Sequence, residues 1–211
     1  MADNYLARKM EEYEAQKCAS VRTRRVSLAS LVAKNRSTRG FDTSFKVRKD
    51  QLRSLVEVAR LVPSARNQQV LRYRLVTEDE AHLVLPHIRL GGSLPELNIT
   101  LPGTEPNPFV VICSEKEGRY VDMDMGIVAQ TMLLRAVEMG LNGVIIAAFD
   151  RDKIANALNL SLAPQLLLAV GRSAEQVEIT DISLGENVNY YRENGVHFVP
   201  KLRIEDLIIE R

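Results

Sequence analysis

The order of the apolar segments constrains the fold of this chain more than any other feature of its 211 residues. Three short runs are apolar at nearly every position: FVVICS at 109–114, GVIIAAF at 143–149 and QLLLAVG at 165–171. Continuous apolar runs of this length are typical of buried strands. Between the first two runs lies GIVAQTMLLRAVEMG at 126–140. This segment is apolar nearly all round, which predicts a helix in the middle of a domain or across a dimer interface.

Strands and helices do not alternate strictly along the chain, so a Rossmann-type sheet is not expected. LRYRLVT at 71–77 alternates apolar and basic residues, as a half-buried strand does. The sequence therefore predicts an α+β fold with a central mixed, mostly antiparallel sheet flanked by helices. Asp50, Asp122 and Asp150 are the expected N-caps of three of these helices.

Two segments are predicted to be irregular. Residues 88–107 are rich in glycine and proline, and residues 172–195 are polar. Long loops often cover binding sites, so both segments are candidates to shape a substrate pocket. At the start of the chain, residues 4–18 have the spacing of an amphipathic helix. We expect an N-terminal helical arm at 1–25 and one main domain at 26–211.

Composition excludes several classes of protein. Lys and Arg total 28 against 27 Asp and Glu, a net charge of +1, which argues against a dedicated nucleic-acid binder. No apolar run approaches the roughly 20 residues of a membrane span, and the polar N-terminus does not resemble a secretory signal. The two cysteines are far apart in the sequence and do not form a disulfide framework, which favours a reducing, cytoplasmic setting. The three histidines and two cysteines have no metal-binding spacing, so no metal site is expected.

Three short segments contain residues suited to binding. Arg36, Ser37 and Arg39 offer guanidinium and hydroxyl donors that match phosphate oxygens, although such a group also occurs in ordinary solvated turns. PSARNQQ at 63–69 ends in amides that suit the edge of a heteroaromatic ring or local backbone. Ala147 and Ala148 are small enough to let a flat ligand approach the backbone, or to serve plain core packing.

Together and in this order, these segments resemble the FMN-dependent nitroreductase family. The matching residues are NRSTRGF at 35–41, PSARNQQ at 63–69, Gly140-Leu141 after the long helix, the Phe149-Asp150 turn, and Lys201 with Arg203 near the end. The resemblance runs from about residue 28 to the C-terminus. Three positions depart from the family pattern: Asn35 replaces an arginine, Val70-Leu71 replaces Pro-Trp, and Ala147-Ala148 replaces acidic or glycine residues.

The resemblance implies an intertwined homodimer with two FMN sites at the subunit interface. Arg36, Ser37 and Arg39 would hold the phosphate and the pyrimidine edge, with Arg39 also stabilising negative charge at N1 and O2. Pro63, Ser64 and Asn67 would come from the partner subunit, and a backbone N–H near Ala147 or Ala148 would face N5. Lys201 would close over the phosphate. The full implied set is Asn35, Arg36, Ser37, Arg39, Pro63, Ser64, Ala65, Asn67, Ile146, Ala147, Ala148, Lys201 and Arg203.

The implied activity is hydride transfer from NADH or NADPH to a nitroaromatic, quinone or similar small acceptor by ping-pong turnover. FMN carries that chemistry, so no side chain is assigned as a catalytic acid or base. Two other interpretations stay open at this point. One is a flavin-binding protein without reductase turnover, used for storage, sensing or flavin breakdown. The other is a dimeric module without flavin, in which the basic turn is only structural.

Overall fold

The computed structural model describes residues 8–12, 26–90 and 103–209. The chain divides into two compact units, Met1–Ala33 and Lys34–Arg211. In the first unit residues 8–12 are helical, and helix α2 covers Leu28–Lys34. The rest of the helix predicted at 4–18 lies outside the described residues, and the arm boundary predicted after residue 25 stays a prediction.

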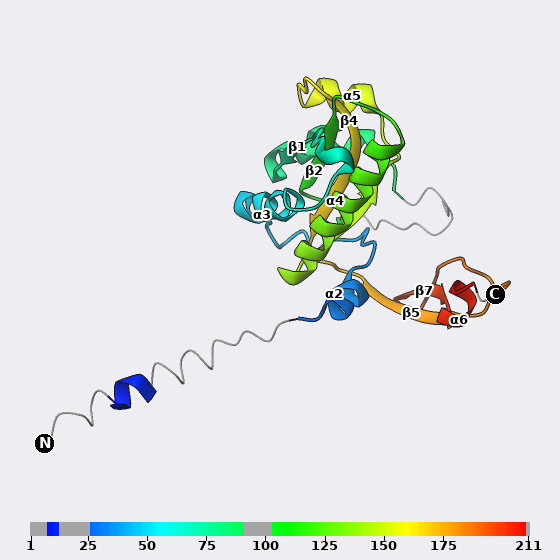
Figure 1. Ribbon diagram of the computed structural model, residues 1–211. Coiled ribbons are helices and arrows are strands. Elements are labelled where there is room, and N and C mark those ends of the chain that lie inside the picture. Colours follow the sequence, from blue (N-terminus) through cyan, green and yellow to red (C-terminus); the bar gives the residue numbers. More distant parts are fainter. Residues whose placement is uncertain (1–7, 13–25, 91–102, 210–211) are drawn as a thin grey trace, which may run out of the picture. The chain divides into compact units, whose positions relative to one another are not determined.

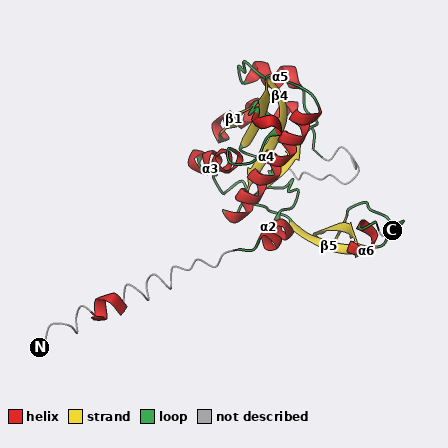
Figure 2. Cartoon of the chain, viewed as in Figure 1, coloured by secondary structure: helices red, strands yellow, loops and turns green. Residues whose placement is uncertain are grey.

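An antiparallel four-stranded sheet forms the centre of the second unit (Figures 1 and 2). Its order is β1 (Leu71–Val76), β2 (Phe109–Ser114), β4 (Ala163–Gly171) and β3 (Asn142–Ile146). All six residues of β2 are buried, as the uninterrupted apolar pattern predicted. β1 and β3 are the two edge strands, and this placement decides where the candidate site residues lie.

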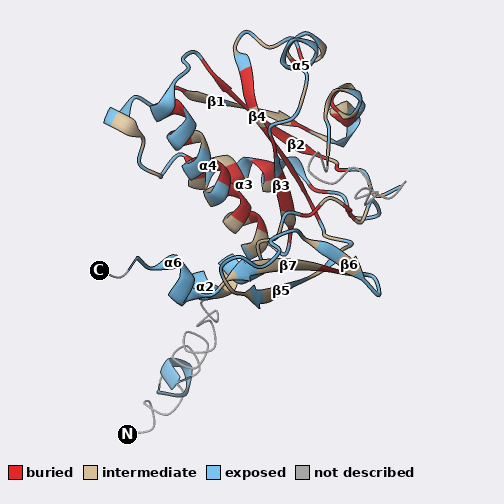
Figure 3. Cartoon of the chain, turned by 90° about the vertical axis from the view of Figure 1, so that its right-hand side faces the viewer, coloured by how far each residue is buried: buried red, intermediate tan, exposed pale blue. Residues whose placement is uncertain are grey.

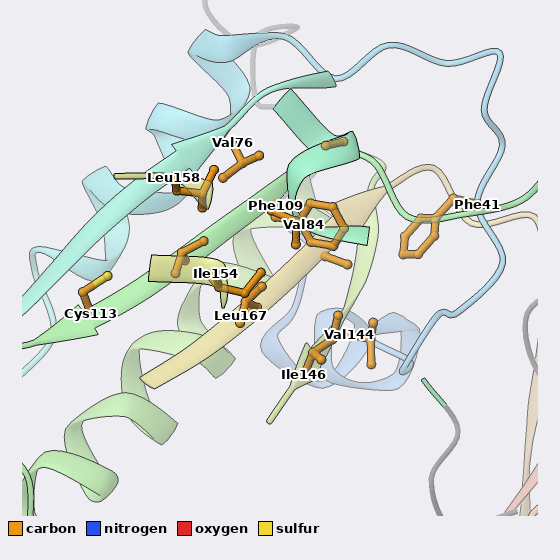
Figure 4. Close-up of a cluster of buried hydrophobic side chains, with 13 residues drawn as sticks. Phe41, Val76, Val84, Phe109, Cys113, Val144, Ile146, Ile154, Leu158 and Leu167 are labelled. Carbon is orange, nitrogen blue, oxygen red and sulfur yellow. The ribbon is translucent and has the colours of Figure 1, made fainter. Parts of the chain in front are cut away.

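Alternate residues of the central strands supply two separate cores, one on each face of the sheet. Phe109, Val111 and Cys113 pack on one face with Phe41 and with Ile154 of helix α5 (Arg151–Ala157) (Figure 4). Val110 and Ile112 pack on the other face against helices α3 (Lys49–Ala59) and α4 (Arg119–Glu138). Because side chains alternate along a strand, one apolar run fills both cores. Figure 3 shows the buried residues of α3 and α4 gathered beside the sheet. The α+β fold with helices flanking an antiparallel sheet is confirmed.

Two of the three predicted helix caps are wrong. α3 (Lys49–Ala59) follows Arg48, and α4 (Arg119–Glu138) follows Gly118, so Asp50 and Asp122 lie inside the first turns. Acidic residues are favourable there as well, because the helix dipole stabilises negative charge throughout the first turn. Asp150 does cap α5 (Arg151–Ala157), accepting a hydrogen bond from the Lys153 N–H at 3.1 Å.

A second sheet follows the first along the chain. It pairs β5 (Gln176–Ile182) in parallel and β6 (Tyr191–Glu193) antiparallel with β7 (Val196–Leu202). The prediction of a loop over 172–195 is therefore wrong for β5 and β6. Most of their residues are exposed or half-buried, so they lack the apolar signal of a buried strand. A short helix, α6 (Ile204–Leu207), follows β7.

Short 3₁₀ turns complete the described residues: Ala65–Asn67, Glu78–Leu83 and Leu85–His87. Of the irregular segment predicted at 88–107, residues 91–102 lie outside the described residues. Within residues 8–12, 26–90 and 103–209, no helix is long and apolar enough to cross a bilayer.

Candidate functional site

The first candidate segment, Asn35–Asp42, lies along the start of the edge strand β3. Ser37 forms a parallel bridge with Gly143, and the Thr38 N–H donates to the Gly143 carbonyl at 3.0 Å. The Asn142 side chain reinforces this contact, accepting from the Arg36 N–H at 3.2 Å and donating to the Lys34 carbonyl at 2.8 Å. Main-chain and amide bonds therefore fix this turn against a rigid strand.

Two buried side chains anchor the same turn. Thr38 is fully buried and Phe41 is 2% exposed. Phe41 packs so closely on Gly171 that a Cβ there would lie 2.7 Å from its ring. With these two residues turned inward, Asn35 and Arg39 are half-buried and Ser37 is exposed, so they stay accessible to a ligand. Burial lowers the pKa of the half-buried Arg36 guanidinium, which is nevertheless a cation in proteins.

Arg39 also connects this turn to the second sheet. Its N–H donates to Glu175 Oε2 at 2.9 Å, and Glu175 in turn forms an ion pair with Arg192 at 2.6 Å. The Arg39 guanidinium carbon lies 5.4 Å from the ring centre of Tyr190, which stacks on His197 at 5.1 Å. The turn is thus held by β3 on one side and by the C-terminal strands on the other.

The third candidate segment lies at the other end of β3. Ile146, its last residue, is buried in the core, so only its backbone is available to a ligand. Ala147 and Ala148 follow outside the strand and are exposed. The Ala148 carbonyl accepts from the Arg89 N–H at 2.8 Å, and the Asp150 N–H donates to the His87 carbonyl at 2.9 Å.

A pocket of about 430 Å³ lies against this segment. It is lined by Pro86, His87, Ile88, Arg89, Ala147, Ala148, Phe149, Asp150 and Lys153. His87 and Lys153 were not among the predicted site residues, and Arg89 was included only as part of the irregular segment 88–107. The only signal was the length of the irregular segment after residue 88, because the pairing of His87–Arg89 with Ala148–Asp150 joins residues about sixty positions apart.

The second candidate segment, Pro63–Gln69, belongs to the opposite edge of the sheet, because it leads directly into β1. The Ala65 N–H donates to Asp124 Oδ1 at 2.9 Å. Arg66, Asn67 and Gln69 have φ of 53°, 51° and 48°, the left-handed region that non-glycine residues seldom adopt. Ser64 and Gln69 line a smaller pocket of about 200 Å³ beside Tyr73 and Asp124.

Lys201 lies in β7 opposite Asp181 of β5, and Arg203 follows the strand, its N–H donating to the Ile182 carbonyl at 3.0 Å. Both side chains are exposed. Their predicted contact with a phosphate stays a prediction.

Edge strand β3 therefore contacts the first segment at its start and leads into the third segment at its end. Gly143 touches the basic turn and Ala147 begins the pocket segment, a separation of about 13 Å along an extended strand. The second segment is at the far edge of the same sheet. The candidate residues of one chain thus lie in two separate groups, one at each edge of the sheet. No group of three or more His, Cys, Asp or Glu in the described part of the chain could hold a metal ion.

Fold and segments together define an α+β protein with a basic turn at one end of an edge strand and a polar pocket at the other. The chain belongs to the nitroreductase family, whose sequence model matches residues 32–98 and 97–172. These ranges contain the first, second and third candidate segments.

Known proteins agree with this assignment. A protein named as a nitroreductase in Methanocaldococcus jannaschii is 42% identical over 57 residues, 27% of this chain and only 29% of its own length. A protein named as an NAD(P)H nitroreductase in Streptococcus pyogenes is 28% identical over 163 residues, 61% of this chain and 82% of its own. The crystal structure of an FMN- and NADPH-dependent nitroreductase from a Sphigopyxis strain has a TM-score of 0.59 at 18% identity, covering 71% of this chain and 89% of that chain.

Proposed function

We propose that this protein is an FMN-dependent oxidoreductase that takes hydride from NADH or NADPH and reduces a small acceptor such as a nitroaromatic or a quinone. Membership of the nitroreductase family supports the enzyme class. The names of the Sphigopyxis and Streptococcus relatives support FMN and a reduced nicotinamide. The observation that carries the proposal is the pairing, along one edge strand, of a basic turn with a pocket beside two alanines.

The residues present at the two ends of edge strand β3 fit FMN. Arg36, Ser37 and Arg39 supply the charged, forked and hydroxyl donors that a phosphate takes. At the other end, Ala147 and Ala148 expose backbone without a large side chain, so a flat ring can approach their amides. Asn35, at the position where the family has arginine, removes one charge from the turn, and Arg36 and Arg39 remain.

FMN, when bound, supplies the hydride chemistry, and the protein binds, orients and shields it. Arg36 and Ser37 would hold the phosphate, and the backbone amides near Ala147 would hold the edge of the ring. Negative charge builds on the acceptor oxygens during reduction, and Arg89 in the pocket provides a nearby cation to offset it. Arg39 is proposed to act in the same way at the pyrimidine edge. The nicotinamide and the acceptor would occupy the pocket in turn, as a ping-pong order requires.

The partial sites at opposite edges of the sheet support a homodimer, because only a second copy can bring Pro63–Asn67 to the Arg36 turn. Helix α4 offers a surface for that association. Tyr120, Met123 and Ile127 are 56%, 48% and 40% exposed and lie on one helical stripe. An apolar stripe left in water is typical of an interface. We propose the intertwined dimer of the family, and a cytoplasmic location stays a prediction.

FMN content is the measurement that tests this function. We expect purified protein to be yellow and to release one FMN per chain on denaturation. It should then oxidise NADH or NADPH when given a nitro or quinone acceptor. A yellow protein that oxidises neither nucleotide with any acceptor would instead favour flavin storage or sensing. A colourless protein that takes up no FMN would contradict both.

The assignment of the turn is tested by combining Arg36→Ala with Ser37→Ala. We expect this double variant to lose FMN and to keep its dimer, because the turn is anchored by Thr38 and Phe41. The matched control combines Arg53→Ala with Ser161→Ala, two exposed residues outside the candidate segments. It should retain full FMN. Stoichiometric FMN in the Arg36 and Ser37 variant would show that the phosphate binds elsewhere.

A further inference from the structure

Asp124 is a buried acid on a helix whose other buried residues are apolar. It is 4% exposed, and its neighbours on the inward side of α4 include Val121 and Val128. Its carboxylate Oδ1 accepts from the Ala65 N–H at 2.9 Å. This hydrogen bond joins the first half of α4 to the turn before β1.

Core packing does not explain this choice of residue. Burying a carboxylate costs free energy unless its hydrogen bonds compensate, and an apolar residue at such a position is often as stable or more stable. Next to Asp124, the smaller pocket of about 200 Å³ also holds Tyr73. Burial raises the pKa of Tyr73, while the nearby Arg72 cation opposes this shift and the Asp124 carboxylate adds to it. Asp124 is thus a buried carboxylate beside this pocket whose hydrogen bond joins two separate elements, which points to a function for that bond.

What the bond holds is a strained turn. Ala65 opens the 3₁₀ turn Ala65–Asn67, and Arg66 and Asn67 follow in left-handed conformations. Such conformations persist when the surroundings fix them, and they occur often at ligand-binding turns. A charge-assisted bond from a rigid helix to the first N–H of the turn is one such constraint.

We propose that Asp124 is a positioning residue for the FMN site of the partner subunit. The inference rests on the proposed function. The turn that Asp124 fixes belongs to the segment Pro63–Gln69, which contains Pro63, Ser64 and Asn67 and leads into β1. The Arg36 turn of the same chain lies against β3, at the opposite edge of the sheet. Asp124 therefore preorganises donors that serve the other chain, and each FMN depends on one Asp124 from across the interface.

Three substitutions at this position test the role of the bond. Asp124→Ala removes the hydrogen-bond acceptor. Asp124→Leu also removes it but places an apolar side chain of larger volume beside the pocket, so this variant serves as the test if the alanine variant is unstable. For both we expect the FMN Kd to rise at least about ten-fold. Asp124→Asn keeps an acceptor oxygen and should rescue most of the affinity. Asp122→Ala, an exposed acid on the same helix, is the control and should leave the Kd unchanged.

A mixed dimer separates positioning in trans from general damage to the fold. One chain carries Asp124→Leu and the other carries Arg36→Ala with Ser37→Ala, each with a different affinity tag. If Asp124 serves the partner, one of the two sites combines an intact Arg36 turn with an intact Pro63 turn, and the mixed dimer binds one FMN. At an FMN concentration near the wild-type Kd, each homodimer of the variants should bind much less FMN than the mixed dimer.

The outcomes are distinct. A mixed dimer without FMN would overturn the assignment in trans, since a cis or purely structural role leaves both sites broken. Full FMN affinity in Asp124→Leu would overturn the inference while leaving the proposed function intact. Wild-type protein that takes up no FMN would overturn the proposed function, and this inference with it.

Discussion

The two polar turns of this protein are built in opposite ways. Asn35–Asp42 has two inward anchors, Thr38 and Phe41, and main-chain bonds to β3. Pro63–Gln69 has no fully buried residue, and three of its residues are left-handed. Its backbone is tied to the buried Asp124. A polar turn can therefore be shaped either by burying part of itself or by a constraint supplied from another element.

The largest effect should come from removing an anchor of the first turn. Phe41→Ala empties a core position that is 2% exposed, and we expect it to reduce the free energy of unfolding by about 3 to 5 kcal/mol. Urea denaturation measures this. Leu61→Ala, beside the second turn and 71% exposed, is the control and should cost less than about 0.5 kcal/mol. A similar loss from both would show that the first turn is not anchored in the core.

A smaller loss is expected where the first turn meets β3. A Cβ on Gly143 would lie 2.3 Å from the Ala169 carbonyl oxygen, so Gly143→Ala forces β3 away from β4. We expect a cost of about 1 to 3 kcal/mol in chemical denaturation, as for other overpacked cores. Ile145→Ala, on the same strand but 41% exposed, should cost less than the glycine substitution. If Gly143→Ala were the milder change, the close approach would be absent in solution.

Acid should loosen the first turn more than the second. Burial lowers the pKa of His197 below its usual value, and the nearby Glu175 carboxylate opposes this while Arg192 and Arg39 add to it. The unfolded chain, with a histidine pKa of about 6.5, therefore takes up the proton first, and stability falls as the pH drops below that value.

Amide exchange checks this prediction at two residues. From about pH 7.5 to about pH 5.5, the Arg39 N–H bonded to Glu175 should lose more protection than the Ala65 N–H bonded to Asp124. His197→Phe keeps a ring for Tyr190 to stack on and should remove the difference. Equal loss at both amides in the wild type would mean that His197 does not control the first turn.

The smallest effects concern backbone freedom. Ser37→Gly should cost about 0.5 to 1 kcal/mol, because glycine gives the unfolded chain more conformations. Arg66→Gly should cost nothing or add up to about 0.5 kcal/mol of stability, since φ of 53° suits glycine. Thermal unfolding of the two variants and of the wild type measures both changes in stability. Equal costs would indicate that Arg66 is not strained in solution.

The apolar runs of the sequence were sufficient to predict the buried strands of the central sheet. Each buried strand of the four-stranded sheet is a short apolar run, and the pattern of FVVICS predicted full burial of β2 correctly. The strands of the second sheet were not predictable in the same way. β5 has no buried residue and pairs with β7 about twenty positions later, so neither an apolar run nor a hairpin turn marks it.

The candidate site residues differ in how far the sequence marks them. The Arg36 turn and Ala147-Ala148 were predicted as candidates because their order matches a family pattern, and their roles stay predictions. Arg89 was not singled out because its place beside Ala148 depends on a long-range pairing. Asp124 had a weak local signal, an acid at helical spacing from Val121 and Val128, but its partner at Ala65 lies in another element.

The two bridges on β3 also bear on solubility. An exposed edge strand is a template on which further chains can add and aggregate. Here Ser37 bridges Gly143 at the start of β3, and Ile88 bridges Phe149 just past its end. Both ends of this edge already have hydrogen-bonding partners within the chain, so only the middle could accept a foreign strand. The same short segments that contain the candidate residues thus discourage open-ended strand addition at the β3 edge of the sheet.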